Sequence, residues 1–370
     1  MGLPNAAIVR RAPSTVSILG TGLIGASLGL AIRRRFPDLE VVGADQNEDH
    51  VLEAVTRGAI TASASIEDAI EAGDLIVAAT PLDATQSVLE DVARHARPGS
   101  LVTDVGSVKG SVLEAATVLP DSVRFVGGHP MAGAATGGPG SADALLFENA
   151  VYVLTPDGID LEDEAPEALW LVETVGARPV VMTAERHDRA VAAVSHLPQL
   201  LAVALVETAA RYGDDALSLA AGGFRDMTRI AGSPFSTWGP ILRDNRDAVL
   251  DTLRTMVRVL EDVQADVGRD LSGLEDVFER AGKTRAALPS SSKGSLAPLS
   301  DVVVWADDRP GFLHALTGVV ADAGLNLRDA ELLRVRTGEV GTFRFGFETP
   351  ADANGAVRAL VKAGYRAERR

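Results

Sequence analysis

Apolar residues in the first part of the chain fall into short continuous runs separated by longer amphipathic segments. The runs TVSILG, EVVGAD, DLIVAATP and LVTDVGS are each bounded by turn residues, and helical patterns such as IGASLGLAIRRRF lie between them. Continuous apolar runs are typical of strands that are buried on both faces of a sheet. This alternation predicts an α/β domain over residues 14–182, with a parallel sheet and helices on both faces.

The pattern changes twice farther along the chain. Over residues 183–282 long helical patterns replace the strands, and Pro198 is expected to kink the first helix because proline lacks a backbone N–H. Residues 283–300 are rich in Ser, Ala, Pro and Lys without periodicity, which indicates a linker. Residues 301–370 have a βαββαβ order. We therefore predict an all-α second domain and a small α+β third domain.

Composition excludes several classes of protein. The formal net charge of −16 over 370 residues argues against binding to nucleic acid or to an anionic membrane. Cysteine is absent, which removes disulfides, thiolate zinc sites and a cysteine nucleophile and fits a reducing compartment. The N-terminus has no apolar core long enough for a signal peptide, and SHLPQ interrupts the longest apolar stretch. We expect a soluble cytoplasmic protein without a metal, in which that stretch is a buried helix.

The segment GTGLIG places Gly20, Gly22 and Gly25 in G-x-G-x-x-G spacing directly between a strand and a helix. The first glycine permits a tight turn, the second lets the backbone approach a pyrophosphate, and the third allows close helix packing. The helix N-terminus then offers free N–H groups and a partial positive charge to the phosphates. These features predict a Rossmann-type dinucleotide site, to which Leu23 and Ile24 also belong.

The residues around this motif indicate which dinucleotide it binds. Asp45 ends the second strand, twenty positions past Gly25, where an acid accepts hydrogen bonds from ribose hydroxyls. No arginine directly follows Asp45, and its charge repels a 2′-phosphate, so NAD is favoured over NADP. Thr80 follows the next strand at the edge that faces a dinucleotide, and we include it as a lining residue. A threonine before a proline is equally often only a turn former.

Histidine is the usual base for a hydroxyl proton that leaves as hydride goes to NAD, because its pKa lies near neutrality. Among the six histidines, His129 in FVGGHPMAG follows a strand at the predicted carboxyl edge of the sheet, where open α/β folds bind ligands. Taken alone, it is equally well a loop histidine bonded to backbone. His187 and His196 are the other two histidines that solvated surface positions do not explain.

Several polar residues carry two interpretations. Ser107 in DVGSVKG either caps the following helix or bonds a substrate or the histidine. His196 in SHLPQ is either a satisfied core residue or part of a pocket. Arg225 and Arg229 lie four apart on one helix face, where one of them can bind a carboxylate bidentately, although surface ion pairing explains them too.

The motifs GTGLIGASLG, DVGSVKG, GGHPMAG, SHLP and GGFRDMTRIA occur in this order and at suitable spacing. Together they resemble the bacterial prephenate dehydrogenases of tyrosine biosynthesis, including the arogenate-using relatives, over roughly residues 14–282. The segment DRPGFLHALTGVVADAGLNL is similar to an ACT domain, a small regulatory module that often binds amino acids.

The resemblance implies an NAD-dependent oxidative decarboxylation of a cyclohexadienol and a helical domain that forms a homodimer. It implies that His129 is the base for the ring hydroxyl, that Ser107 orients the hydroxyl and the histidine, and that Arg229 binds a substrate carboxylate. It also implies that His196 lines the pocket and that the neighbouring subunit contributes Trp238. We expect prephenate as substrate, with arogenate as the alternative.

One segment departs from the family. Many relatives follow HPMAG with TEKSG, whereas this chain reads AATGG and has Ala135 in the acidic position. An acid therefore has no role there, and the preference for the pyruvyl group of prephenate or the alanyl group of arogenate is left open. Gly311 and Asn326 lie near turns where related ACT modules hold an amino acid, so feedback by tyrosine is a hypothesis.

Two rival functions fit the sequence less well. A β-hydroxyacid dehydrogenase also joins a Rossmann domain to helices, but it needs a catalytic lysine in the helical domain, and residues 184–281 contain none. A non-catalytic sensor of NAD or amino acids has little reason to combine His129, Ser107 and Arg229. An enzyme is therefore favoured.

Overall fold

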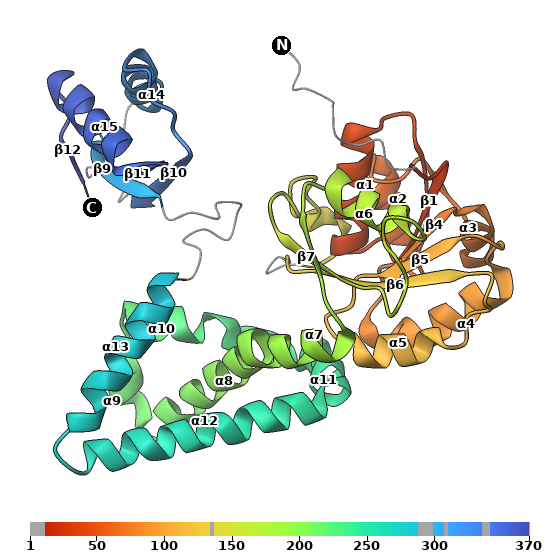
Figure 1. Ribbon diagram of the computed structural model, residues 1–370, viewed down its shortest axis with the longest axis horizontal. Helices are drawn as coiled ribbons and strands as arrows, with labels where there is room; N and C mark the ends of the chain where they lie inside the picture. Colours follow the sequence, from red (N-terminus) through yellow and green to blue (C-terminus); the bar gives the residue numbers. More distant parts are fainter. Residues whose placement is uncertain (1–11, 134–136, 288–298, 307–309, 335–340, 370) are drawn as a thin grey trace. The chain divides into compact units, whose positions relative to one another are not determined.

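The structure is a computed structural model that describes residues 12–133, 137–287, 299–306, 310–334 and 341–369. The chain forms two compact units that divide between Asp270 and Leu271. Each unit has its own sheet and its own core (Figure 1). The predicted α/β and all-α domains therefore pack into one unit, and their boundaries stay predictions.

The first unit contains an eight-stranded sheet in the order β3-β2-β1-β4-β5-β6-β7-β8. Strands β1 to β6 are parallel, as predicted, but β7 runs antiparallel to β6. The prediction of a wholly parallel sheet is wrong at this pair, because a continuous apolar run does not record strand direction. The strands are β1 Thr15–Leu19, β2 Glu40–Ala44, β3 Ala62–Ser63, β4 Leu75–Ala78, β5 Leu101–Asp104, β6 Arg124–Pro130, β7 Val151–Thr155 and β8 Arg178–Val181.

Helices cover both faces of this sheet (Figure 1). Alternate strand residues enter two separate cores. Leu75 and Val77 of β4 pack with α1 and α6 around Trp170, whereas Ile76 and Ala78 pack with α3, α4 and α5. The helices are α1 Leu23–Arg35, α2 Glu48–Thr56, α3 Ile66–Ala72, α4 Thr85–His95, α5 Gly110–Ala116 and α6 Pro166–Thr174, with short turns η1 Leu82–Ala84 and η2 Pro139–Ser141. Burial on both faces explains the continuous apolar runs.

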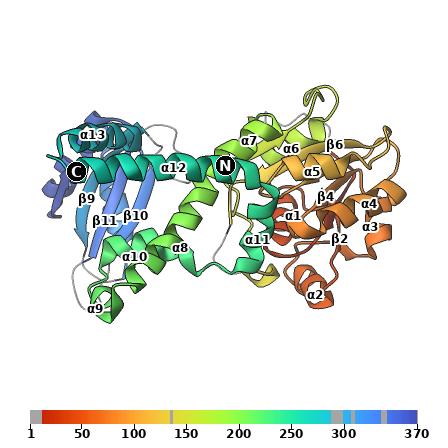
Figure 2. The same ribbon diagram turned by 90° about the horizontal axis from the view of Figure 1, so that it is seen from below.

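The rest of the first unit is helical (Figure 2). The elements are α7 Ala184–Val191, η3 Ala192–His196, α8 Leu197–Ala210, α9 Gly213–Ser218, α10 Gly222–Thr228, η4 Arg229–Gly232, α11 Phe235–Asp244 and α12 Arg246–Val267. The disturbance expected at Pro198 takes the form of one wide π-helical turn, η3, which joins α7 to α8. This turn ends at His196.

The helical stretch Ala184–Ala210 is long and apolar enough to cross a membrane, a test that core helices of soluble proteins also pass. Of its most apolar 18-residue window, 33% is buried. It is therefore less buried in the single chain than predicted, and Val194 is 70% exposed.

The second unit contains α13 Ser272–Ala287 and the predicted βαββαβ order: β9 Ser300–Ala306, α14 Phe312–Asp322, β10 Asp329–Arg334, β11 Gly341–Phe347, α15 Pro350–Lys362 and β12 Ala367–Arg369. Its antiparallel sheet has the order β10-β11-β9-β12. Val302, Val304, Phe345 and Phe347 form its core with α14 and α15. The predicted linker differs at its start, because α13 continues through Ala287.

Candidate active site

The glycine loop has the geometry that its spacing predicts. Gly20 has a φ of +96°, and a Cβ there would lie 2.6 Å from the carbonyl oxygen of Ala79. A Cβ at Gly25 would overlap the carbonyl oxygen of Gly20, so α1 packs directly on the turn. Gly22, by contrast, caps α1 with open space beside its Cα. The loop is thus closed on its protein side and open at the helix N-terminus, as a pyrophosphate cradle requires.

Asp45 and Thr80 flank this loop. The Asp45 carboxylate accepts hydrogen bonds from the backbone N–H of Thr21 at 2.7 Å and of Asn47 at 2.9 Å, which fix it beside the glycines. The hydroxyl of Thr80 is buried and has no hydrogen-bond partner among the described residues. An unpaired buried hydroxyl beside an open loop fits a missing polar ligand. These residues, with the half-buried Leu23 and Ile24, fit a bound dinucleotide.

His129 lies within the last part of β6 rather than after it, where it pairs with Val153 of β7. Its Nδ1 atom lies 2.8 Å from Nε2 of His187, the first histidine of α7. Nδ1 of His187 lies 2.7 Å from Oδ1 of Asp188. His187 is only 1% exposed. A chain of two imidazoles and a carboxylate therefore runs from the sheet edge into the helical part of the unit.

The Asp188 carboxylate also holds the start of α5. It accepts the backbone N–H of Lys109 and of Gly110, both at 2.8 Å. No side chain of the preceding loop caps this helix, so the prediction that Ser107 caps it is wrong. Ser107 itself is half-buried between β5 and α5. Its alternative role toward a substrate stays a prediction.

A buried ion pair lies beneath His129. The Lys109 ammonium is fully buried and donates to the Asp104 carboxylate and to the carbonyl oxygen of Gly128. Asp104 accepts the Gly128 N–H in return, at 2.9 Å. A Cβ at Gly128 would lie 2.5 Å from the carbonyl oxygen of Asp104. The glycine before His129 is therefore required by the close approach of β5.

These surroundings set the protonation of the site. Burial, followed by the positive charge of Lys109, lowers the pKa of His129 well below 6.5, so its imidazole is neutral at pH 7. Burial alone would raise the pKa of Asp188, but hydrogen bonds from His187 and from the backbone of α5 outweigh burial and lower it. A neutral imidazole with an ionised carboxylate behind it is the arrangement of a general base.

His196 joins the same cluster through Asn245. Nδ2 of Asn245 donates to the carbonyl oxygen of Asp188 at 2.8 Å and lies 3.2 Å from Nδ1 of His196. Burial lowers the pKa of His196 to about 4, so this ring is neutral as well. The ring of Trp238 packs edge-on against it, with centroids 6.0 Å apart. Trp238 thus contacts His196 of its own chain, and its contribution to a neighbouring subunit stays a prediction.

The two arginines lie at a helix end rather than on one continuous helix. Helix α10 stops at Thr228, and Arg229 begins the turn η4. Both Arg225 and Arg229 are exposed, and within the described ranges neither forms an ion pair with an acidic side chain. The amide of Gln199, three residues beyond His196, donates to the carbonyl oxygen of Ile230 at 3.0 Å and ties η4 to α8. Ala135 lies outside the described residues.

Four residues of this cluster were assigned no role from the sequence: Lys109, His187, Asp188 and Asn245. Lys109 stands within DVGSVKG, and a single buried lysine gives no pattern of its own. The pair His187–Asp188 in ERHDRA gave no usable signal either, because consecutive residues of a helix do not ordinarily face each other.

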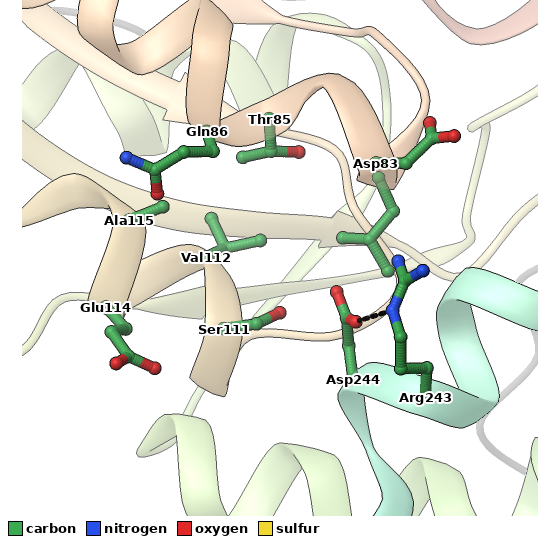
Figure 3. Close-up of a pocket in the computed structure, with 10 residues that line it drawn as sticks. Asp83, Thr85, Gln86, Ser111, Val112, Glu114, Ala115, Arg243 and Asp244 are labelled. Atoms are coloured by element: carbon green, nitrogen blue, oxygen red, sulfur yellow. Dashed lines mark hydrogen bonds and ion pairs between the residues drawn. The ribbon is translucent and has the colours of Figure 1, made fainter.

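A cavity of about 320 Å³ lies behind the cluster, between the start of α4, α5 and the end of α11 (Figure 3). Its wall includes Ser111, next to Gly110, and Asp244, next to Asn245, and Arg243 pairs with Asp244 at 3.0 Å. None of the predicted site residues lines it. The cavity is therefore separate from the histidine cluster.

The fold and site define a Rossmann-type nucleotide-binding protein with a histidine cluster at the edge of its sheet. Family models described as the nucleotide-binding domain and the dimerization domain of prephenate dehydrogenase match residues 28–181 and 183–277, and an ACT domain model matches residues 300–359. The chain belongs to the prephenate dehydrogenase family. This confirms the resemblance and the three-part fold class that the motifs predict.

The chain is similar to named proteins over most of its length. It is 34% identical to the prephenate dehydrogenase of Bacillus subtilis (strain 168), across 94% of this chain and 95% of that protein. The crystal structure of Synechocystis arogenate dehydrogenase has a TM-score of 0.65 at 30% identity and covers 74% of this chain and 100% of its own. Prephenate dehydrogenase from A. aeolicus, in complex with hydroxyphenyl propionate and NAD+, has a TM-score of 0.69 at 28% identity, over 75% of this chain and 98% of its own.

Proposed function

We propose that this chain is an NAD-dependent dehydrogenase that converts prephenate to 4-hydroxyphenylpyruvate and carbon dioxide in tyrosine biosynthesis. The observation that carries the proposal is the position of His129. It lies at the carboxyl edge of the sheet, neutral, with Nδ1 engaged by His187. Its Nε2 atom has no hydrogen-bond partner within residues 12–133 and 137–287. A base whose Nδ1 atom is held by a hydrogen bond and whose Nε2 atom has no such partner suits a substrate hydroxyl.

Each residue of the site has a separate role in this reaction. Bound NAD supplies the hydride acceptor for the ring carbon that bears the hydroxyl. His129 accepts the hydroxyl proton at Nε2, and Ser107 orients the hydroxyl. Arg229 binds a substrate carboxylate, with Arg225 beside it. As hydride leaves, the ring carboxylate departs as carbon dioxide, and the proton held by His129 returns to the phenolate oxygen to give the phenol. Aromatisation of the ring makes the step effectively irreversible. The protein contributes mainly alignment and a proton acceptor.

The glycine loop with Asp45 supports NAD rather than NADP. The carboxylate stands where it accepts hydrogen bonds from ribose hydroxyls, and a 2′-phosphate would meet a like charge there. Gly22 gives the pyrophosphate access to the N-terminus of α1, and the unpaired hydroxyl of Thr80 is available to the cofactor. Leu23 and Ile24 complete the wall.

Prephenate is favoured over arogenate because arogenate carries an ammonium that needs a free carboxylate. Both carboxylates described around His129 have cationic or N–H partners, since Asp188 binds His187, Lys109 and Gly110 and Asp104 pairs with Lys109. Arogenate is the second candidate, since the Synechocystis relative is named for it. The test is NADH formation with prephenate and arogenate in parallel, each with NAD and with NADP. Faster turnover of arogenate would reverse the substrate assignment.

We propose that two copies of the chain associate through the helical domain. The family model names residues 183–277 a dimerization domain. Several large apolar side chains there are exposed in the single chain, among them Leu219 at 82%, Phe235 at 78% and Met227 at 70%. Surfaces of this kind mark protein interfaces. A dimer mass in sedimentation is expected, whereas a monomer at micromolar concentration contradicts it. The cytoplasmic location stays a prediction.

We propose that the ACT domain binds an amino acid, with tyrosine as the expected effector. Gly311 has a φ of +81° and caps α14, which leaves the helix N-terminus without a side chain over it. Asn326 is exposed after the same helix. Calorimetry with tyrosine, together with rates over a broad tyrosine range, tests this. The idea is abandoned if tyrosine neither binds nor changes the rate.

A further inference from the structure

We propose that His187 and Asp188 are positioning residues that hold His129 in the tautomer with its proton on Nδ1 and that share the proton it takes from the substrate. The reaction in which this occurs rests on the proposed function. The tautomer itself follows from the geometry of the free protein.

The direction of each hydrogen bond follows from the Asp188 end. An ionised carboxylate only accepts, and Asp188 already accepts two backbone N–H groups of α5. Nδ1 of His187 must therefore carry the hydrogen in its 2.7 Å contact with Asp188. In a neutral ring this leaves Nε2 of His187 as an acceptor. The 2.8 Å contact then requires Nδ1–H on His129, which leaves the lone pair of that ring on Nε2.

Burial limits the alternatives to this tautomer of His129. His187 is 1% exposed, so water does not offer its nitrogens alternative partners. The ring planes of His129 and His187 are inclined at 76° with centroids 5.0 Å apart, and the 2.8 Å contact joins one nitrogen of each ring. Asp188 is itself fixed, because Asn245 binds its backbone carbonyl and α5 binds its carboxylate. The hydrogen bonds between His129, His187 and Asp188 therefore have few other arrangements.

The same contacts give the proton a second position. When Nε2 of His129 takes the hydroxyl proton, an N–H bond forms there and the ring becomes a cation. The Nδ1–H bond can then break as a new N–H bond forms at Nε2 of His187, 2.8 Å away. No electrons are gained or lost by either ring. The positive charge comes to lie beside the Asp188 carboxylate and farther from the substrate.

Two substitutions separate positioning from simple structural support. In Asp188→Asn the amide oxygen can still accept the Gly110 N–H, while the NH₂ group in the place of Oδ1 donates to His187 and leaves the Lys109 N–H without its acceptor. The two hydrogen bonds that link residue 188, His187 and His129 then reverse direction. His129 carries its hydrogen on Nε2, and this hydrogen blocks uptake of the substrate proton there. His187→Phe removes the link to His129 but leaves both backbone N–H groups on Asp188. Glu167→Gln is the matched control, because Glu167 is a buried carboxylate paired with Arg124 at 3.2 Å outside the cluster.

The experiment measures kcat and KM for prephenate, the melting temperature, and the ¹⁵N NMR signals of the histidine rings in the full-length protein without substrate. Asp188→Asn should lower kcat about 10²–10⁴-fold, by analogy with a triad histidine forced into its wrong tautomer, and His187→Phe should have a smaller effect in the same direction. KM should stay close to wild type in both variants. The melting temperature should stay close to wild type in His187→Phe and fall in Asp188→Asn, where the Lys109 N–H loses its acceptor. Glu167→Gln should leave kcat unchanged. NMR should show Nδ1–H for His129 in wild type and Nε2–H in Asp188→Asn.

A wild-type spectrum with the hydrogen on Nε2 of His129 overturns the proposal. So does a change in kcat of less than about threefold in both variants, since a transition-state role must appear in kcat. Failure of the wild type to oxidise prephenate or arogenate counts against the proposed function alone, because the NMR measurement needs no turnover.

Discussion

Nδ1 of His129 lies 2.8 Å from Nε2 of His187, and this contact joins β6 to α7 across 58 positions of the chain. The first residue lies at the edge of the nucleotide-binding sheet and the second in the helical part of the same unit. The base that we assign to the reaction is therefore held by a residue of the other predicted domain.

The buried pair of Lys109 and Asp104 should contribute strongly to stability. Lys109→Met leaves the Asp104 carboxylate buried without its cation, and such a loss costs about 3–5 kcal/mol of unfolding free energy. Urea unfolding followed by tryptophan fluorescence measures it. Arg94→Met removes the exposed pair with Asp91 and should cost less than about 1 kcal/mol. Equal losses in the two variants would contradict this account.

Asp45 should set the choice of dinucleotide. Asp45→Ser removes the acceptor for ribose hydroxyls and the charge that repels a 2′-phosphate, so KM for NAD should rise and use of NADP should improve. We expect the ratio of kcat/KM for NADP over NAD to increase on the order of tenfold or more. Asp49→Ser changes an exposed acid in the first turn of α2 and is the control. An unchanged ratio in Asp45→Ser would remove Asp45 from the cofactor site.

Arg229 should act in substrate binding. Arg229→Leu should raise KM for prephenate by roughly 10–100-fold and change kcat much less, because a charge-assisted bond to a carboxylate is lost from both ground state and transition state. Arg211→Leu, at the exposed end of α8, should leave both constants unchanged. The role passes to Arg225 if Arg225→Leu has the larger effect on KM.

The decline of kcat/KM on the acid side of the pH profile should have its midpoint below pH 6.5. The pKa of His129 is lowered by burial and by Lys109, so its imidazole stays neutral and able to accept a proton at pH 6.5. As pH falls through the lowered pKa, the ring becomes protonated and kcat/KM declines. A profile of kcat/KM with prephenate from pH 4 to 8, an interval of about four units around the ordinary histidine value, measures this. A midpoint at or above 6.5 would contradict a buried neutral base.

Local spacing predicted the parts of the molecule that depend on few residues. The turn at Gly20, the open space at Gly22 and the acid at Asp45 follow from one strand, one turn and one helix. The βαββαβ order of the last domain follows from periodicity in the same way. In each case the contacts that matter join neighbouring elements, and the family motifs added the position of His129.

Contacts between distant segments were not predictable. Asp188 takes the capping role that was expected of Ser107, because α7 packs against the start of α5 and brings a carboxylate to its N–H groups. The direction of β7 depends on the end of the sheet from which the chain enters that strand. Neither the residue types nor their spacing records such packing.

The central claim is that His129 is the base of an NAD-dependent oxidation of prephenate. Its most direct test is the rate of NADH formation from prephenate and NAD by wild type and by His129→Asn. Loss of a general base should lower kcat about 10²–10⁴-fold, with NAD affinity and melting temperature retained. Equal rates for the two proteins would contradict the claim.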